Sequence, residues 1–248
     1  MYHSKGMNKM SVKPCRSDAC QEFVYDTSHW KVFQGLREKA AFLMSALERF
    51  HLPAVVHGSV ARGDVKAGSD VDVFIVGGVQ NSFLVETALE QAGIKVNSRY
   101  IVQATPAYAM KAHLIIDDVV SSVSFPLMDM RRVEREFYVF GGEITLDQLK
   151  AGLRVAGVNK QLMFVEPNLE GHAESSLSGG EVFVAKTLGI SVETVRDRVR
   201  ALTKRDLVGR TGVFVKKELA PQETFELALK RFSDFNPAVR RRTRKKFS

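Results

Sequence analysis

Two short apolar runs separated by a polar stretch constrain this chain more than any other feature. The runs cover residues 54–56 and 71–76, and two aspartates of equal parity, Asp70 and Asp72, lie at the start of the second. Successive side chains of a β-strand point to opposite faces, so residues two apart project together. Two carboxylates about 6 to 7 Å apart on an apolar strand are unfavourable unless a cation neutralises them. The pattern therefore predicts a site for a hard divalent cation, Mg²⁺ or Mn²⁺.

The turn that follows the first run contains Gly58-Ser59. Glycine lets the backbone approach a ligand closely, and Ser59 opens a segment whose free N–H groups would bind phosphate oxygens. A phosphate cradle followed by a pair of metal-binding carboxylates is typical of phosphoryl or nucleotidyl transfer. The alternative is a strand with surface aspartates beside a glycine-rich turn.

Three groups of residues in this stretch carry a family resemblance: Gly58-Ser59, Ala61-Arg62-Gly63-Asp64 and Ser69-Asp70-Val71-Asp72. Together they resemble the signature of the DNA polymerase beta-like nucleotidyltransferase superfamily, in particular its minimal nucleotidyltransferase branch, with looser agreement as far as Leu127. The resemblance implies a small mixed sheet with helices, a nucleoside triphosphate as donor and three carboxylates around two metal ions. Gly58, Ser59 and Arg62 would then bind the donor phosphates, and Asp70 and Asp72 would hold both metals as catalytic residues.

The superfamily also needs a third carboxylate on a neighbouring strand. Asp117 is the candidate for this catalytic and metal-binding position, because it ends an apolar run and shares strand parity with His113 and Ile115. Asp118 is the alternative, and both aspartates also suit a plain turn. His57, directly before the glycine turn, either lines the nucleotide pocket or is a packed or capping residue.

Composition argues against several classes of protein. The 248 residues contain no run of eighteen apolar residues, so no membrane-spanning helix is expected. Residues 1–19 lack the apolar core of a signal peptide. Cys15 and Cys20 are expected to be free thiols in a reducing cytosol, with a disulfide or half a metal site as the alternatives. A cytoplasmic protein without membrane contact is therefore expected.

Apolar periodicity and the resemblance together predict an α+β protein with a mixed nucleotidyltransferase sheet and a smaller winged-helix domain. A first helix is expected from Thr27 or Ser28, and Thr145 with Gln148 predicts a capping box for a later one. Asn159-Lys160 predicts a hairpin turn. The expected divisions are a flexible leader at 1–26, a nucleotidyltransferase domain at 27–140, a hairpin and linker at 141–180, a winged helix-turn-helix domain at 181–236 and a basic tail at 237–248.

The segment from residue 181 to 217 reads as helix, tight turn, helix and hairpin. Ser191 is a suitable cap for the second helix, and the expected hairpin at 208–217 has its tip at 209–212. This order resembles the winged helix-turn-helix domains of bacterial and archaeal regulators. It therefore predicts a second module that contacts nucleic acid.

The net charge of +8 is confined to the C-terminal part of the chain. Residues 1–150 carry 17 basic and 17 acidic residues, so the whole excess lies in 151–248. Such asymmetry indicates a polyanionic partner, RNA or DNA. The alternatives are a salt-bridged or protein-docking helix, since Glu193 and Asp197 share its face, and a tail that only aids solubility. The candidate nucleic-acid-binding residues are Arg196, Arg200, Lys204, Arg210, Arg240, Arg241 and Arg242.

These patterns favour a Mg²⁺-dependent nucleotidyltransferase that moves a nucleoside monophosphate from a nucleoside triphosphate to a hydroxyl acceptor and releases pyrophosphate. RNA or DNA is the favoured acceptor, and Mn²⁺ is the alternative metal. The alternative function is a nucleotide-sensing, winged-helix DNA-binding regulator with a non-catalytic nucleotidyltransferase-like domain. A homo-oligomer or a small protein partner is compatible with either.

Overall fold

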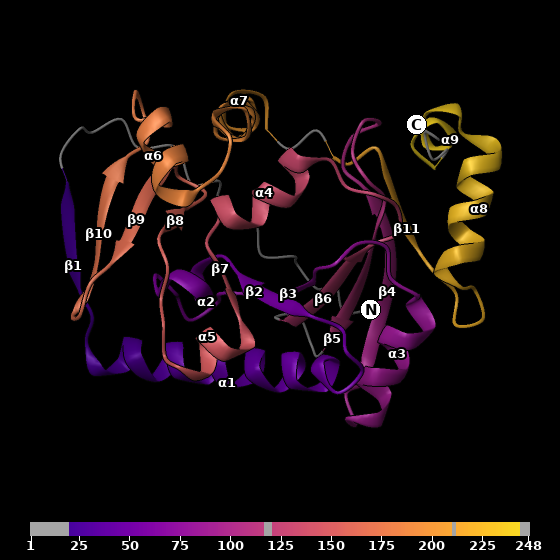
Figure 1. Ribbon diagram of the computed structural model, residues 1–248, viewed down its shortest axis with the longest axis horizontal. Coiled ribbons are helices and arrows are strands. Elements are labelled where there is room, and N and C mark those ends of the chain that lie inside the picture. The colour runs from indigo at the N-terminus through magenta and orange to yellow at the C-terminus, as the bar shows by residue number, and fades with distance from the viewer. Residues whose placement is uncertain (1–19, 117–120, 210–211, 244–248) are drawn as a thin grey trace, which may run out of the picture.

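The computed structural model describes residues 20–116, 121–209 and 212–243, whose strands form two sheets (Figure 1). The larger sheet contains β2 (Ala54–His57), β3 (Val71–Ile75), β4 (Val96–Gln103), β5 (Lys111–Ile116), β6 (Ser121–Pro126), β7 (Glu143–Thr145) and β11 (Val215–Glu218). Its order is β11-β4-β5-β6-β3-β2-β7. Strands β3 and β6 are parallel and the other neighbours are antiparallel, so the expected mixed sheet of an α+β protein is confirmed.

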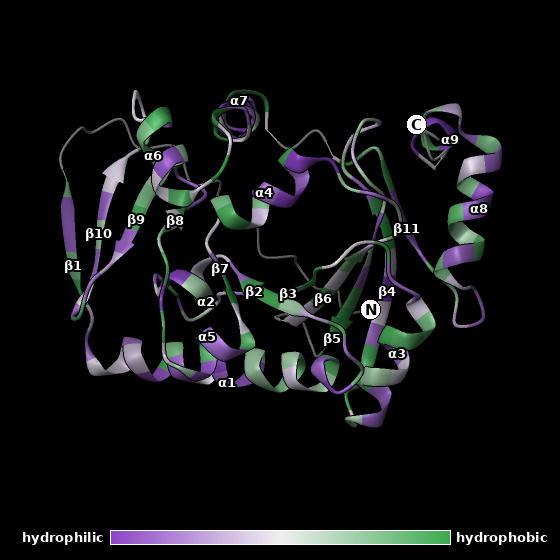
Figure 2. Cartoon of the chain, in the orientation of Figure 1, coloured by the Kyte–Doolittle hydropathy of each residue, from purple (hydrophilic) through white to green (hydrophobic). Residues whose placement is uncertain are grey.

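Helices cover both faces of the larger sheet. The helices are α1 (Thr27–Glu48), α2 (Ser59–Arg62), α3 (Ser82–Gln91), α4 (Arg132–Phe140), α5 (Leu146–Lys150), α6 (Glu181–Leu188), α7 (Val192–Val208), α8 (Phe225–Phe235) and α9 (Pro237–Thr243). On one face α1 and α3 pack against buried alternate residues such as Val73 and Leu114. On the other face Tyr138 of α4 stacks on Phe74, with ring centroids 3.8 Å apart. Figure 2 shows hydrophobic colour along β2 and β5 and a hydrophilic start to α4.

Capping residues define where several helices begin. Asp26 caps α1 in place of the expected Thr27 or Ser28, because its carboxylate accepts the His29 N–H at 2.7 Å. The expected capping box of α5 is present: Gln148 donates its N–H to Thr145 and accepts the Thr145 N–H in return. Local polar side chains thus fix these two helix starts.

The smaller sheet corrects two expectations. It contains β1 (Gln21–Val24), β8 (Gly157–Val158), β9 (Met163–Pro167) and β10 (Gly171–Ser176), in the order β1-β10-β9-β8. Residues 21–24, expected in the leader, and residues 171–176, expected in the linker, therefore pair as strands. Asn168 closes the tight turn between β9 and β10 by accepting the N–H groups of Glu170 and Gly171. Gly171 is needed there because a Cβ would lie 1.8 Å from the Phe23 carbonyl oxygen.

The expected helix-turn-helix of α6 and α7 is present. Gly189 ends α6 in a left-handed conformation, and the Ser191 side chain accepts the Thr194 N–H at the start of α7. Val184 and Val195 of these helices pack with Val158 and Phe164 in a second hydrophobic core. The helix pair is therefore attached to the smaller sheet, not to a separate module.

The structure does not pair residues 215–218 within the hairpin that was expected at 208–217 as a wing. Strand β11 pairs in antiparallel register with β4, and Val215 lies opposite Gln103, so this strand extends the larger sheet. Helix α8 follows it, and its Phe225 ring contacts Phe125 of β6 with centroids 5.8 Å apart. Two effects explain the difference. Pairing with β11 satisfies N–H groups of β4 that would otherwise be unpaired at the edge of the sheet. Helix α8 removes the adjoining apolar surface from water. Residues 181–236 therefore belong to two different cores.

The described part of the expected basic tail is helical. In α9 the Val239 side chain is fully buried, and the Arg242 guanidinium donates to the Asp129 carbonyl oxygen at 2.8 Å. Arg240 donates to the carbonyl oxygens of Ser233 and Asp234. In the described ranges, no helix is both long enough and apolar enough to cross a bilayer.

Candidate functional site

The turn at the end of β2 has the backbone that the sequence predicts. Gly58 has φ +81° and ψ −145°, a conformation that side chains with a Cβ avoid, and α2 begins at Ser59. The Gly58 N–H donates to the Gly142 carbonyl oxygen at 2.8 Å. The Gly58 N–H thus makes a hydrogen bond within the protein. The phosphate contacts predicted for Gly58 and Ser59 stay predictions.

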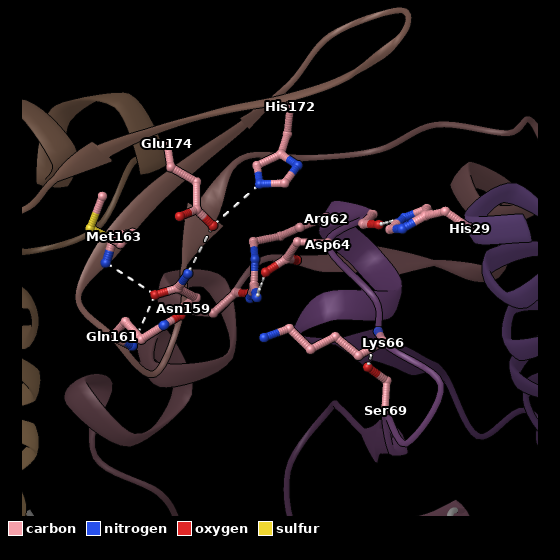
Figure 3. A network of polar contacts seen from close by, with 12 residues as sticks. His29, Arg62, Asp64, Lys66, Ser69, Asn159, Gln161, Met163, His172 and Glu174 are labelled. Atoms are coloured by element: carbon pink, nitrogen blue, oxygen red, sulfur yellow. Dashed lines mark hydrogen bonds and ion pairs between the residues drawn. The ribbon is translucent and has the colours of Figure 1, made fainter. Parts of the chain in front are cut away.

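Arg62 is buried at the end of α2 with only 5% of its surface exposed. Its guanidinium donates to the Gly141 carbonyl oxygen and to Asp64, 2.7 Å away. Figure 3 shows this pair beside a second network, in which Glu174 joins His172 to Asn159. In the structure Arg62 thus links α2 to the α4–β7 turn, and its predicted contact with donor phosphates stays untested.

Asp72 lies on the face of β3 that α4 covers. It is in register with His57 of β2 and Ser122 of β6, and the Ser122 hydroxyl donates to its carboxylate at 2.7 Å. Asp70 directly precedes β3 and is half-buried. Ser121 of β6 pairs with Val71 of β3 and with Ile116 of β5. The start of β3, the start of β6 and the end of β5 therefore lie side by side, next to Asp70.

The candidates for the third carboxylate, Asp117 and Asp118, lie outside the described residues. Within the described ranges, no group of three or more acidic, histidine or cysteine residues could hold a metal ion. Mg²⁺ is commonly held by one or two carboxylates together with water and substrate phosphates. The carboxylates of Asp70 and Asp72 thus suit Mg²⁺ by their chemistry, and a third protein ligand would have to come from outside the described residues.

A cavity of about 300 Å³ lies between this face of the sheet and α4. Its floor consists of alternate residues from neighbouring strands, so their side chains share one face. The floor residues that carry polar groups are His57, Asp72, Lys111, His113, Ser122 and Ser124. Phe137 and Tyr138 of α4 and Tyr108 form the walls.

Lys111 brings a positive charge to this cavity. Its ammonium donates to the Tyr138 hydroxyl at 2.8 Å and lies over the Tyr138 and Phe74 rings, 4.8 and 5.5 Å from their centroids. Burial lowers the pKa of Lys111 to about 8. Lys111 is therefore still largely charged at neutral pH.

The two histidines of the cavity are neutral at pH 7. Burial lowers the pKa of His57 to about 4 although the Asp72 carboxylate opposes the shift. Burial and the nearby Lys111 ammonium lower the pKa of His113 to about 4 as well. Burial raises the pKa of the Tyr138 phenol, which stays protonated. Lys111 and Asp72 are therefore the charged groups among the cavity's lining residues.

A comparison with protein families finds a match to the strands that form the cavity floor. Residues 44–133 match the family model of a nucleotidyltransferase domain. The match spans β2 to β6 and so includes Asp70, Asp72 and the cavity floor. It supports the nucleotidyltransferase superfamily and nucleotidyl transfer as the general activity. Searches of curated proteins and of solved structures found no significant match.

The basic residues expected to meet nucleic acid are arranged differently in α7 and α9. Arg196, Arg200 and Lys204 are exposed on α7 at intervals of four residues, which places them on one stripe. The α9 arginines Arg240 and Arg242 use their guanidinium groups in contacts within the protein. Arg241 is exposed and Arg210 lies outside the described residues.

Two acidic residues of α7, Glu193 and Asp197, contact side chains of other segments. Glu193 lies 3.7 Å from Arg132, and Asp197 accepts the Tyr108 hydroxyl at 2.8 Å. The expectation that these two carboxylates pair with Arg196 and Arg200 is therefore not met by the contacts that the structure shows. Both carboxylates instead connect α7 to segments beside the cavity.

The sequence reasoning missed most of the cavity. It singled out His57 and Asp72 but not Lys111, Ser122 or Tyr138. A signal existed in the alternation of polar and apolar residues along 111–116 and 121–125, which puts Lys111 and Ser122 on the face away from the core.

Proposed function

We propose that this protein is a Mg²⁺-dependent nucleotidyltransferase that transfers a nucleoside monophosphate from a nucleoside triphosphate to a hydroxyl group. The observation that carries the proposal is the position of Asp72. It lies in the segment that matches a nucleotidyltransferase domain, it lines a cavity, and Ser122 orients its carboxylate. In the transfer a bond forms between the acceptor oxygen and the α-phosphorus, the α–β phosphoanhydride bond breaks, and pyrophosphate leaves.

Asp70 and Asp72 are the residues that would hold Mg²⁺, with Asp117 or Asp118 as the third carboxylate. A bound Mg²⁺ supplies positive charge to the phosphate oxygens of the donor. The hydrogen bond from Ser122 fixes one oxygen of Asp72 and leaves the other available as a ligand.

Nucleic acid is the acceptor that we propose. The exposed stripe of Arg196, Arg200 and Lys204 on α7 supports it, because phosphate contacts come from such rows of cations. Asp197 of α7 accepts the hydroxyl of Tyr108, which lines the cavity, so a nucleic-acid strand bound along α7 would lie beside the cavity. The reaction would take place in the cytoplasm, where triphosphates and RNA or DNA occur together.

The direct test is incubation with each α-labelled nucleoside triphosphate and Mg²⁺, with total RNA, duplex DNA and cell protein as acceptors. We expect the wild-type protein to label the nucleic acid and the Asp72→Asn variant to lose the activity. Asp129→Asn is the matched control, since Asp129 is an exposed carboxylate outside the cavity lining. Equal labelling by the wild type and Asp72→Asn would contradict the proposal.

A nucleotide-sensing DNA-binding regulator is the second candidate. It is favoured by Ser122 and Ser124, because the residues of β6 that face the cavity carry hydroxyls where a further carboxylate would assist a metal. The same incubation separates the two. Triphosphate binding and DNA retention without label transfer would support the regulator.

A further inference from the structure

Arg198 of α7 lies against a wall of the cavity. Its guanidinium carbon is 4.7 Å from the centre of the Phe137 ring, and Phe137 lines the cavity together with Tyr108. Tyr108 donates its hydroxyl to Asp197, the neighbour of Arg198 in the chain, at 2.8 Å. Two consecutive residues of α7 therefore lie next to the cavity that contains Asp72.

The guanidinium of Arg198 is half-buried, and among the described residues no acceptor lies within hydrogen-bond distance of it. Two charged neighbours act on it with opposite signs, the Asp197 carboxylate and the Arg205 guanidinium. The Asp197 carboxylate also accepts the Tyr108 hydroxyl. A guanidinium carries several N–H donors in one plane, which match the oxygen atoms of a phosphate group. The terminal N–H groups of Arg198 therefore suit a phosphate at this side of the cavity.

A second guanidinium lies over Tyr108. The guanidinium carbon of Arg131 is 4.7 Å from the centre of the Tyr108 ring, and the Arg131 side chain is 42% exposed. Its Nε is 3.3 Å from the Glu134 carboxylate, which also lies 3.7 Å from Arg242. One carboxylate thus serves two guanidinium groups. The rim of the cavity formed by Arg131, Tyr108 and Arg198 therefore favours an anionic ligand.

Helical geometry separates Arg198 from the exposed basic stripe of α7. Arg196 and Arg200 are each two residues from Arg198, which corresponds to about 200° around an α-helix. They line a different pocket, together with Glu181 of α6, whereas Arg198 lies over Phe137 of α4. The stripe alone would therefore hold a strand on the side of α7 away from Phe137, and Arg198 provides the contact beside the cavity.

The size of the cavity limits what can pass this rim. A volume of about 300 Å³ lies at the lower end of the range for small-molecule pockets. The paired end of a duplex is much larger than such a ligand and stays outside. An acceptor hydroxyl that reaches Asp72 therefore belongs to an unpaired end of the nucleic acid.

We propose that Arg198, together with Arg131, binds a phosphate group of a single-stranded acceptor end where the strand enters the cavity. The inference rests on the proposed function for its acceptor. It deepens that function by naming the contact beside the cavity and by restricting the acceptor to an unpaired end.

The salt dependence of oligonucleotide binding tests the assignment. Fluorescence anisotropy with 5′-labelled single strands of mixed sequence, RNA and DNA, would compare the wild type with Arg198→Met, Arg198→Lys and Arg49→Met. Arg49 is the matched control, an exposed arginine at the end of α1. Loss of one phosphate contact lowers the slope of log affinity against log salt by about 0.7 for a single strand.

We expect Arg198→Met to show this smaller slope and to bind about ten-fold more weakly, since it removes a charged hydrogen-bond donor. Arg198→Lys should keep the slope because it keeps the charge, and Arg49→Met should match the wild type. Circular dichroism checks the fold, which methionine is expected to preserve because its thioether packs well on an aromatic ring such as Phe137. If Arg198→Met does not fold, Arg198→Gln takes its place with the same expected loss.

Three results would overturn the inference: wild-type protein that binds neither oligonucleotide, an unchanged slope in Arg198→Met, or a blunt duplex that binds with the same dependence on Arg198. A smaller slope in Arg200→Met but not in Arg198→Met would show that the stripe alone holds the strand. Arg198-dependent binding without label transfer would reject the proposed function alone. Label transfer to nucleic acid with unaltered binding by Arg198→Met would reject this inference alone.

Discussion

At position 58 the backbone, not a side chain, requires glycine. With φ +81° and ψ −145°, an alanine there would be strained, so we expect Gly58→Ala to lower the free energy of unfolding by about 1–3 kcal/mol. Gly35 is the matched control, because it lies within α1 with no atom within 4 Å of an added Cβ. Gly35→Ala should stabilise the protein by about 0.5–1 kcal/mol. Urea denaturation measures both, and a stabilised Gly58→Ala protein would contradict the backbone argument.

His113 makes the stability depend on pH in a predictable direction. Its pKa is about 4 in the folded protein and 6.5 in the unfolded chain, so between these values the unfolded chain binds more protons. The free energy of unfolding should therefore fall as the pH decreases from about 6.5 to about 4, and the loss is complete below about 4. In metal-free buffer, His113→Gln should lose less stability between pH 7 and pH 5 than the wild type.

Urea denaturation at the two pH values checks this prediction. His51→Gln is the control, since His51 is exposed and lies outside the cavity lining. Carboxylates also take up protons in this range, but they do so equally in the wild type and both variants. An unchanged pH dependence in His113→Gln would show that His113 is not held neutral in the fold.

At the scale of elements, Glu136 of α4 holds the start of α7. Its carboxylate accepts the hydroxyls of Ser191 and Thr194, each at 2.5 Å, and the Ser191 N–H at 3.1 Å. Thr194 is fully buried, so Glu136→Ala removes a charged acceptor from a buried hydroxyl, which keeps only its contact with the Ser191 hydroxyl, 3.0 Å away. We expect a loss of about 1–3 kcal/mol in the free energy of unfolding.

Hydrogen exchange localises the effect of this substitution. Amides of α7 should exchange faster in Glu136→Ala than in the wild type, while those of β3 keep their protection. Glu193→Ala is the control, because the Glu193 side chain is 69% exposed and its contact with Arg132 is 3.7 Å long. Equal exchange of α7 in all three proteins would mean that other contacts hold this helix.

The elements that the sequence predicts well are those with local signals. The capping box of Thr145 and Gln148 and the cap at Ser191 each lie within four residues of the helix that they start, and the structure contains both. Strands β1 and β10 have no such signal, because they are short and polar and pair Gln21 with Glu174. Pairing of that kind depends on contacts made after the chain has folded.

The same distinction applies to the candidate site. The equal parity of Asp70 and Asp72 can be read from three adjacent residues, and Asp72, but not Asp70, is among the residues that line the cavity. Lys111 and Tyr138 come together from β5 and α4, 27 residues apart. Alternation along 111–116 indicates the face on which Lys111 lies, but no spacing rule for one strand or one helix connects it to Tyr138, so their contact follows only from the packing of α4 on the sheet.

At the scale of the whole molecule, the C-terminal residues complete the larger sheet and its cover. Strand β11 pairs with β4, and Glu226 of α8 accepts both the N–H and the hydroxyl of Ser82 at the start of α3. Arg242 of α9 donates to the Asp129 carbonyl oxygen before α4. The basic part of the chain is thus built into the same body as the segment that matches a nucleotidyltransferase domain, and Figure 1 shows α8 and α9 on the side of β11 and β4.

This arrangement predicts that residues 181–248 do not fold alone. The fragment would contain Val184 and Val195 without their partner Phe164, and β11 without β4, so its apolar surface would stay exposed. We expect circular dichroism of the fragment to show little helix and no cooperative thermal transition, whereas the full chain shows both. An independently folded winged-helix domain would instead melt cooperatively as a helical fragment. That outcome would mean that α6, α7 and α8 can form a core of their own without the two sheets.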